Sequence, residues 1–191
     1  MLSSKKEGIM QMTNYTDRLV LSILPNSEAD KVLAFYENNK DFFEPWEPER
    51  EPNFYTISYQ RITLSIEYNL MLQTKALRFW AFEQDNLHNI IGTVNFYNIL
   101  RGPYSTCQIG YKFDQNHTGK GYALESIQAG MDLLFQEYHI HRIEANIMPS
   151  NRPSIHLIEK LGFSYEGLAV SCIKVNGQWQ DHSRYAYINN D

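Results

Sequence analysis

The chain has little cysteine, proline or glycine, and no long apolar run. Its 191 residues include 2 cysteines, 7 prolines and 10 glycines. Cys107 and Cys172 lie in strand-like runs without the spacing of metal ligands, so we expect two reduced thiols. No run of about 18 apolar residues is present, and the opening MLSSKKEGIMQM lacks the apolar stretch of a signal peptide. We therefore expect a cytoplasmic protein without a membrane partner.

Positive charge is also in short supply. The chain has 17 Lys and Arg against 22 Asp and Glu, for a net charge of −5. This balance argues against a nucleic-acid surface and suits a cationic or amine-bearing partner. A hydrophobic fraction of 43% is enough for one buried core. We expect one domain over residues 15–191 behind a flexible polar tail, residues 1–14.

The hydrophobic periodicity changes along the chain and predicts alternating helices and strands. Ser27 is expected to cap the first helix, and Asn176-Gly177 to form a hairpin turn. An antiparallel meander is expected from residue 77 to residue 113. Strands are predicted at 16–24, 77–83, 90–99, 105–113, 141–147, 163–175 and 178–189, and helices at 27–38, 54–73, 122–138 and 153–161.

The segment Asp41 to Pro52, DFFEPWEPEREP, is too rich in proline for a long regular element. One interpretation is a solvated connecting loop pinned by its aromatic residues. The other is the rim of a substrate site, in which Trp46 packs on the substrate. In that case Glu44, Glu47, Glu49 and Glu51 would attract a cation.

The stretch QIGYKFDQNHTGKGYALE, residues 108–125, indicates a strand, a glycine turn and the start of a helix. A helix that begins at a bare glycine turn directs free N–H groups and its positive dipole end outward, as phosphate sites do. A dinucleotide fingerprint requires a third glycine where Leu124 stands, and a P-loop requires a hydroxyl residue where Gly121 stands. Both nucleotide motifs are therefore disfavoured. An ordinary turn between strand and helix stays a possible interpretation.

Two motifs together resemble the GNAT superfamily of N-acetyltransferases. The first is Thr118-Gly119-Lys120-Gly121-Tyr122-Ala123, with Thr118 where Gln or Arg is usual. The second is NRPSIHLIEKLGF, residues 151–163, followed by Glu166-Gly167. With Arg142 to Ala145 and Ile109 to Tyr111, the pattern is similar to the branch of the ribosomal-protein-alanine N-acetyltransferases. The resemblance implies an α/β (α+β) GNAT fold, a mostly antiparallel sheet of about seven strands flanked by helices, with a splayed central strand pair.

The resemblance also implies a site for acetyl-coenzyme A. Backbone N–H groups from Gly119 to Ala123 would hold its pyrophosphate, and the pantetheine would run along Tyr111 to Phe113. Asn151 would bind a pantetheine amide, although it is equally suited to cap a helix. The expected coenzyme-binding residues are Tyr111, Lys112, Phe113, Thr118, Gly119, Lys120, Gly121, Tyr122, Ala123, Asn151 and Ser154.

The implied reaction is attack of a neutral amine on the acetyl carbonyl, with backbone N–H groups stabilising the oxyanion. Family members often carry a proton-donating tyrosine where this chain has Ile158, so Ser154 is the expected acid, assisted by Asn151. Tyr111 and Tyr97 are alternatives. Some relatives carry a glutamate where Gln108 stands, which leaves a base acting through water from Glu144, His182 or Glu83, or no base. Trp46, Glu47 and Gln108 are the expected acceptor-side residues.

His139 and His141 form an H-x-H pair, but no third ligand has usable spacing, so no metal is expected. The sequence therefore predicts an acetyltransferase that uses acetyl-coenzyme A and acts on a protein or peptide N-terminus, as a monomer or homodimer. A small amine acceptor, such as a polyamine, amino acid or drug, is an alternative. A coenzyme A-binding module with weak catalysis is another.

Overall fold

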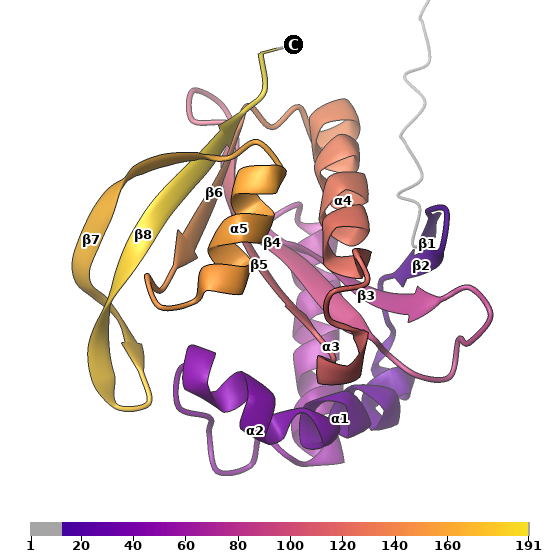
Figure 1. Ribbon diagram of the computed structural model, residues 1–191. Coiled ribbons are helices and arrows are strands. Elements are labelled where there is room, and N and C mark those ends of the chain that lie inside the picture. Colours follow the sequence, from indigo (N-terminus) through magenta and orange to yellow (C-terminus); the bar gives the residue numbers. More distant parts are fainter. Residues whose placement is uncertain (1–12, 191) are drawn as a thin grey trace, which may run out of the picture.

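The computed structural model describes residues 13–190 and contains an eight-stranded sheet. The strand order is β1-β2-β3-β4-β5-β6-β8-β7, and Figure 1 shows the helices on both sides of the sheet. All neighbouring strands are antiparallel except β5 and β6. The strands are β1 Thr13–Tyr15, β2 Leu19–Ser22, β3 Leu77–Glu83, β4 Gly92–Leu100, β5 Thr106–Phe113, β6 Arg142–Ile147, β7 Ser164–Val175 and β8 Gln178–Ile188.

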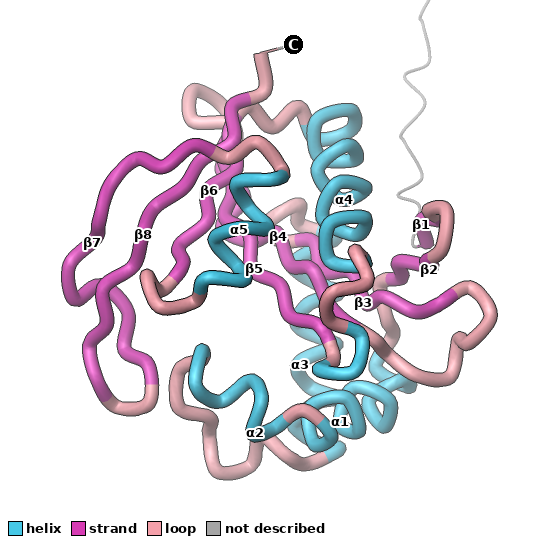
Figure 2. The backbone as a smooth tube through the Cα atoms, in the orientation of Figure 1, coloured by secondary structure: helices cyan, strands magenta, loops and turns pink. Residues whose placement is uncertain are grey.

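Two groups of helices lie on the two faces of the sheet, as the backbone tube in Figure 2 shows. Alternation along β3 directs Phe79 toward one core and Trp80 toward the other. Helices α4 and α5 cover the first core, and α1 and α3 cover the second. The helices are α1 Ala29–Asn38, α2 Lys40–Phe43, α3 Ile57–Leu72, α4 Tyr122–Tyr138 and α5 Arg152–Lys160. Among the described residues, no helix has the length and apolarity to cross a membrane.

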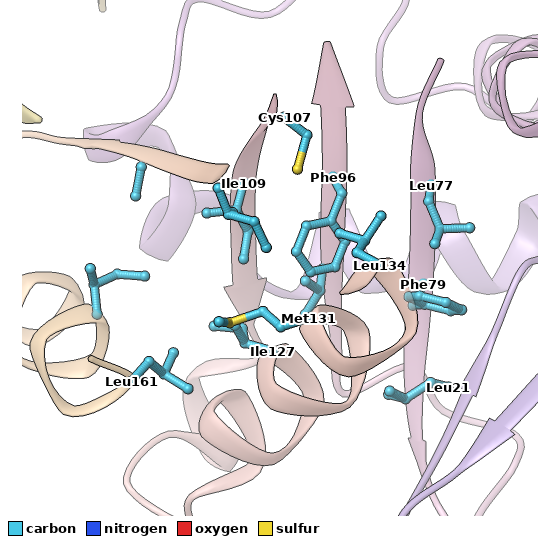
Figure 3. Packing of buried hydrophobic residues seen from close by; sticks show 14 of the residues in the cluster. Leu21, Leu77, Phe79, Phe96, Cys107, Ile109, Ile127, Met131, Leu134 and Leu161 are labelled. Atoms are coloured by element: carbon cyan, nitrogen blue, oxygen red, sulfur yellow. The ribbon is translucent and has the colours of Figure 1, made fainter. Parts of the chain in front are cut away.

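Helix α4 packs tightly on the centre of the sheet. Figure 3 shows Ile127, Met131 and Leu134 of this helix facing Phe96 of β4, and all four side chains are fully buried. The close approach requires Gly130, because a Cβ at that position would lie 2.5 Å from the Phe96 ring. The packing fixes α4, and with it the glycine turn before the helix, relative to β4 and β5.

The parallel pair β5 and β6 separates partway along its length. Its paired residues run from Thr106 opposite Arg142 to Ile109 opposite Ala145, and the pairing ends there. Strand β5 continues to Phe113, and β6 turns away after Ile147 into the segment that leads to α5. The splayed strand pair implied by the family resemblance is therefore present.

The structure corrects several predicted boundaries. The predicted strand at 16–24 is shorter, and a further strand, β1, precedes it, so the sheet has eight strands. Thr13 and Asn14 belong to β1, whereas residues 1–12 of the predicted tail lie outside the described part of the chain. Ser27 does not cap α1, because it lies inside the 3-10 turn Asn26–Glu28 and makes no side-chain cap. A three-residue strand is too short for periodicity to reveal.

The remaining predicted elements are confirmed to within a few residues. The segment 41–52 contains no long regular element, only the end of α2 and the 3-10 turn η2 Glu44–Trp46. The helix predicted at 54–73 is α3. The β-hairpin with Asn176-Gly177 at its turn joins β7 to β8, with positive φ at both turn residues.

Candidate active site

The glycine turn between β5 and α4 forms a cradle of backbone N–H groups. Gly119 has φ 75° and Gly121 has φ 82°, the left-handed region that favours glycine. Gly121 is the N-cap of the 17-residue helix α4 and provides no side chain to bind its first N–H groups. Those groups and the positive end of the helix dipole are therefore available to an anion.

Arg18, directly before β2, holds this cradle in place. Its Nη1 donates to the Lys120 carbonyl oxygen at 2.9 Å, and its Nε donates to Glu125 Oε2 at 2.7 Å. The Arg18 guanidinium also lies 4.7 Å from the centre of the Tyr122 ring. Thr16 Oγ1 donates to the other Glu125 oxygen at 2.6 Å. The turn before β2 and the first turn of α4 are thus joined through one carboxylate.

Sequence reasoning missed Arg18. The residue lies more than 100 positions before its partners, and no local periodicity connects them. The only signal in the sequence was Glu125 in the Gly-Lys-Gly-Tyr-Ala-x-Glu motif, whose carboxylate in a helix first turn would favour a basic partner.

Three of the predicted residues meet where β5 and β6 separate. Tyr111 Oη, from β5, lies 2.6 Å from Ser154 Oγ and 3.2 Å from the Ser154 carbonyl oxygen, so its one hydroxyl proton can be donated to either oxygen. Asn151 is the N-cap of α5, and its Oδ1 accepts from Ser154 N at 3.2 Å. Burial raises the pKa of Tyr111 to about 12, and the hydrogen bond with Ser154 offsets only part of that effect. Tyr111 is therefore neutral and able to donate at physiological pH.

The comparisons with known proteins agree with this geometry. Residues 18–164 match the family described as "Acetyltransferase (GNAT) domain". The chain belongs to the GNAT family of acetyltransferases. It is 36% identical over 167 residues to the [ribosomal protein uS5]-alanine N-acetyltransferase of Escherichia coli, covering 87% of this chain and 86% of that protein.

Two solved structures extend the GNAT comparison. The ribosomal-protein-S5-alanine acetyltransferase of Vibrio fischeri superposes with a TM-score of 0.89 at 29% identity, covering 95% of this chain and 98% of the other. The RimJ protein of Mycobacterium smegmatis, solved in complex with CoA-disulfide, superposes with a TM-score of 0.83 at 25% identity. That match covers 89% of this chain and 81% of the other.

Thr118, Lys120, Tyr122 and Ala123, which are also predicted coenzyme residues of this GNAT chain, belong to the glycine turn or to the first turn of α4. Thr118 Oγ1 donates to Gln115 O at 2.9 Å, and Tyr122 Oη donates to Glu83 at 2.7 Å. Lys120 Nζ lies 6.0 Å from the centre of the Tyr122 ring. Lys112 lies on β5, and its ammonium is paired with Glu47. Phe113 is buried and Ala123 is half-buried against the same core.

The predicted acceptor residues occupy two separate places. Trp46 is 40% exposed in η2, and the adjacent Glu44 carbonyl accepts from Asn176 Nδ2 at 2.9 Å, which joins this segment to the β7–β8 hairpin. Glu47 is held between Lys112 and Arg50. Gln108 lies in the paired part of β5 opposite Glu144 and accepts from Asn98 Nδ2 at 3.1 Å.

The candidate acids and bases differ in how their side chains are engaged. Ile158 of α5 is fully buried in the core and offers no proton. Glu144 accepts from Arg142 Nε at 2.7 Å. His182 is buried in β8, with Nδ1 3.2 Å from the Gln180 carbonyl and 3.6 Å from Cys172 Sγ. Of these groups and Ser154, only Ser154 is hydrogen bonded to Tyr111 at the strand separation.

His139 closes α4 in the left-handed conformation, with φ 52°. Across residues 13–190 there is no group of three or more His, Cys, Asp and Glu side chains placed to hold a metal ion.

Proposed function

We propose that this chain transfers the acetyl group of acetyl-coenzyme A to the N-terminal amine of a protein, of the kind that ribosomal-protein-alanine N-acetyltransferases modify. The observation that carries the proposal is the Tyr111, Ser154 and Asn151 cluster at the strand separation, beside a helix that opens on Gly121. Similarity to the Escherichia coli enzyme across 87% of the chain supports the choice of acceptor.

The residues of the cradle fit the coenzyme. The two left-handed glycines and the uncapped start of α4 suit a pyrophosphate, because bare N–H groups and a helix dipole stabilise negative charge. Beyond Ile109, β5 has no pairing with β6 and can pair with an extended pantetheine arm. Acetyl-coenzyme A supplies the acetyl group as an activated thioester, and the chain's task is to place the thioester between the separated strands.

Ser154 is our proposed proton donor to the sulfur. As the amine forms its bond to the acetyl carbon, the carbon–sulfur bond breaks and the departing thiolate takes a proton. When Tyr111 Oη donates to Ser154 Oγ, the hydroxyl proton of Ser154 is free to point toward the sulfur. The attacking nitrogen releases its extra proton to water. Asn151 positions Ser154 by fixing the first turn of α5.

An N-terminal amine suits this site, because among residues 13–190 the Ser154 hydroxyl is hydrogen bonded to Tyr111 and to no carboxylate or histidine. An α-amino group has a pKa of about 8, so roughly a tenth of it is neutral at pH 7, whereas a lysine amine, with a pKa of about 10.4, is roughly two hundred times less often neutral. The N-terminus can therefore attack without a dedicated base.

The test is acetyl transfer followed by mass spectrometry. The purified chain and acetyl-coenzyme A are incubated with alanine-initiated peptides, the same peptides blocked at the N-terminus, and a panel of polyamines, amino acids and amine drugs. We expect mass gain only on free N-termini. Transfer to the small amines alone would favour the alternative acceptor class. No transfer to any amine, with coenzyme A still bound, would reject acetyl transfer in favour of a binding module.

Ser154→Ala tests the proposed acid. General acid catalysis contributes on the order of 10²-fold, so kcat should fall about that much while the affinity for coenzyme A, measured by calorimetry, stays within about twofold. Asn151→Asp, which keeps an acceptor for Ser154 N, is the matched control and should lose less. A Ser154→Ala variant with the same kcat as the unmodified chain would show that Ser154 is not the proton donor.

A further inference from the structure

Glu47 bridges two cations that come from different parts of the chain. Its Oε1 is paired with Lys112 Nζ of β5, and its Oε2 is paired with Arg50 Nη2 of its own loop. The Glu47 side chain is 15% exposed, and those of Lys112 and Arg50 are 22% and 26% exposed. These three side chains, which we call the Glu47 clamp, are thus largely shielded from water.

Aromatic rings form the walls of the Glu47 clamp. Lys112 Nζ lies 5.3 Å from the ring centre of Tyr36 and 5.6 Å from that of Phe43. The Arg50 guanidinium lies 4.1 Å from the ring centre of Phe54. Cations attract the faces of such rings, and ion pairs are stronger where water is excluded. Removing Glu47 would leave two cations together without their counterion, which is costly in a covered site.

The Glu47 clamp connects segment 44–56, which contains the predicted acceptor residues Trp46 and Glu47, to β5. Lys112 follows Tyr111 directly on β5, and successive side chains of a strand point to opposite faces. Tyr111 reaches Ser154 on the α5 face, whereas Lys112 reaches Glu47 on the other face. The same end of the loop is also bound to the β7–β8 hairpin, because Asn176 Nδ2 donates to the carbonyl of Glu44, three residues before Glu47. Glu44 and Glu47 therefore bind the start of segment 44–56 to two neighbouring elements, the β7–β8 hairpin and β5.

We propose that Glu47 is a positioning residue for the amine acceptor. Its ion pair with Lys112 fixes the position of segment 44–56 relative to β5, and that position determines the affinity for the acceptor. The inference depends on the proposed function, because it assigns the acceptor to this face. This proposal differs from the alternative in which the acidic residues of the loop attract a cationic acceptor through their charge. In the clamp the carboxylate of Glu47 is already neutralised by two cations, so its geometry matters more than its field.

A matched pair of variants separates geometry from field. Glu47→Gln and Glu49→Gln remove the same charge from neighbouring positions, but Glu49 is exposed and, within residues 13–190, has no ion pair. We expect Glu47→Gln to raise KM for the peptide acceptor about tenfold and to leave KM for acetyl-coenzyme A within about twofold. Glu49→Gln should change neither by more than about twofold. Equal increases in acceptor KM for the two variants would overturn the proposal in favour of a field effect.

Lys112 provides the second arm of the experiment. Lys112→Met should raise acceptor KM as Glu47→Gln does, Lys112→Arg should restore most of the affinity, and the double variant Glu47→Gln with Lys112→Met should be no worse than either single variant. Effects that simply add would mean that the two residues act independently, which contradicts the clamp.

Hydrogen exchange makes the test independent of catalysis. Amides of segment 44–56 should exchange about tenfold faster in Glu47→Gln than in Glu49→Gln, while those of α4 stay unchanged as a control for folding. If the unmodified chain acetylates no amine, the proposed function fails and the exchange rates still test the clamp. Unchanged exchange in Glu47→Gln, with unchanged acceptor KM in an active enzyme, would overturn this inference alone.

Discussion

At the scale of single residues, Arg18 binds the glycine turn that forms the proposed coenzyme cradle. It binds the Lys120 carbonyl between the two glycines and the Glu125 carboxylate in the first turn of α4. A Cβ at Gly121 would lie 3.3 Å from Arg18 Nη2, so the glycine also makes room for the guanidinium. The planar fork of arginine makes these contacts simultaneously, which a lysine cannot do.

We predict that Arg18→Gln raises KM for acetyl-coenzyme A about tenfold, because the glycine turn loses its hydrogen bond with the Arg18 guanidinium. The KM of Arg18→Lys should lie between that of Arg18→Gln and that of the unmodified chain. KM for the acceptor should stay within about twofold. Steady-state kinetics and calorimetry with coenzyme A provide the measurements. Arg61→Gln, an equal charge change at an exposed position of α3, is the control. An Arg18→Gln enzyme that matches this control would show that the cradle holds its shape without Arg18.

Cys107 makes stability depend on alkaline pH. The thiol is 1% exposed, and burial, with a smaller contribution from Glu144, raises its pKa from an ordinary value of about 9 to about 12. The unfolded chain therefore loses this proton at lower pH than the folded chain. The resulting stability is complete below pH 9 and is lost as the pH rises toward 12.

We predict that the free energy of unfolding falls by about 1 kcal/mol between pH 9 and pH 10 through Cys107, with a limiting slope of about 1.4 kcal/mol per pH unit. Urea unfolding at several pH values measures the change, and Cys107→Val should remove this part of the slope. A Cys107→Val slope identical to that of the unmodified chain would mean that the thiol does not ionise differently in the two states.

At the scale of elements, the packing of α4 against β4 leaves no room for a methyl group at Gly130. Alanine is normally better than glycine inside a helix by about 1 kcal/mol. Here the added Cβ would lie 2.5 Å from the ring of Phe96, which is fully buried. Forcing extra volume into a packed core costs about 1–3 kcal/mol. The clash should therefore outweigh the gain in helix propensity.

We predict that Gly130→Ala lowers the free energy of unfolding by about 1 kcal/mol, because an overpacking cost of about 2 kcal/mol exceeds a propensity gain of about 1 kcal/mol. Chemical denaturation measures the change, and Gln128→Ala, at an exposed position of the same helix, should change stability by less than about 0.5 kcal/mol. A stabilised Gly130→Ala variant would show that β4 and α4 move apart easily.

At the scale of the whole molecule, the coenzyme should act as a stabilising ligand, because its proposed site joins β5, α4 and α5, which are assembled only in the folded chain. A ligand that binds only the folded state contributes about 2.7 kcal/mol at one hundred times its Kd. For a chain of this size, each kcal/mol raises Tm by about 2–4 °C.

We therefore predict that coenzyme A at about one hundred times its Kd raises Tm by about 5–10 °C. Gly121→Glu, which places a carboxylate and a strained backbone at the cradle, should lose most of this shift at the same coenzyme concentration. Scanning calorimetry measures both. Equal shifts for Gly121→Glu and the unmodified chain would place the coenzyme somewhere other than this helix terminus.

Much of the fold followed from patterns that are local in the chain. The helical period of α4, the alternation in β6 and the Asn176-Gly177 turn each depend on residues within one element, so their physical cause can be recognised without the rest of the molecule. The same is true of the left-handed glycines before α4, whose role depends on the turn itself. The two sequence motifs also indicate the GNAT family without the tertiary structure.

Only the tertiary structure decided which distant residues meet. Arg18 contacts Glu125, Glu47 contacts Lys112, and Tyr111 contacts Ser154, each across a separation that periodicity does not cover. From the sequence, Lys112 was predicted to bind the coenzyme and Glu47 to contact the acceptor. The structure shows in addition that these two side chains form an ion pair with each other. The reason is physical: a side chain's partners depend on how strands, helices and loops pack, and that packing is a property of the whole chain.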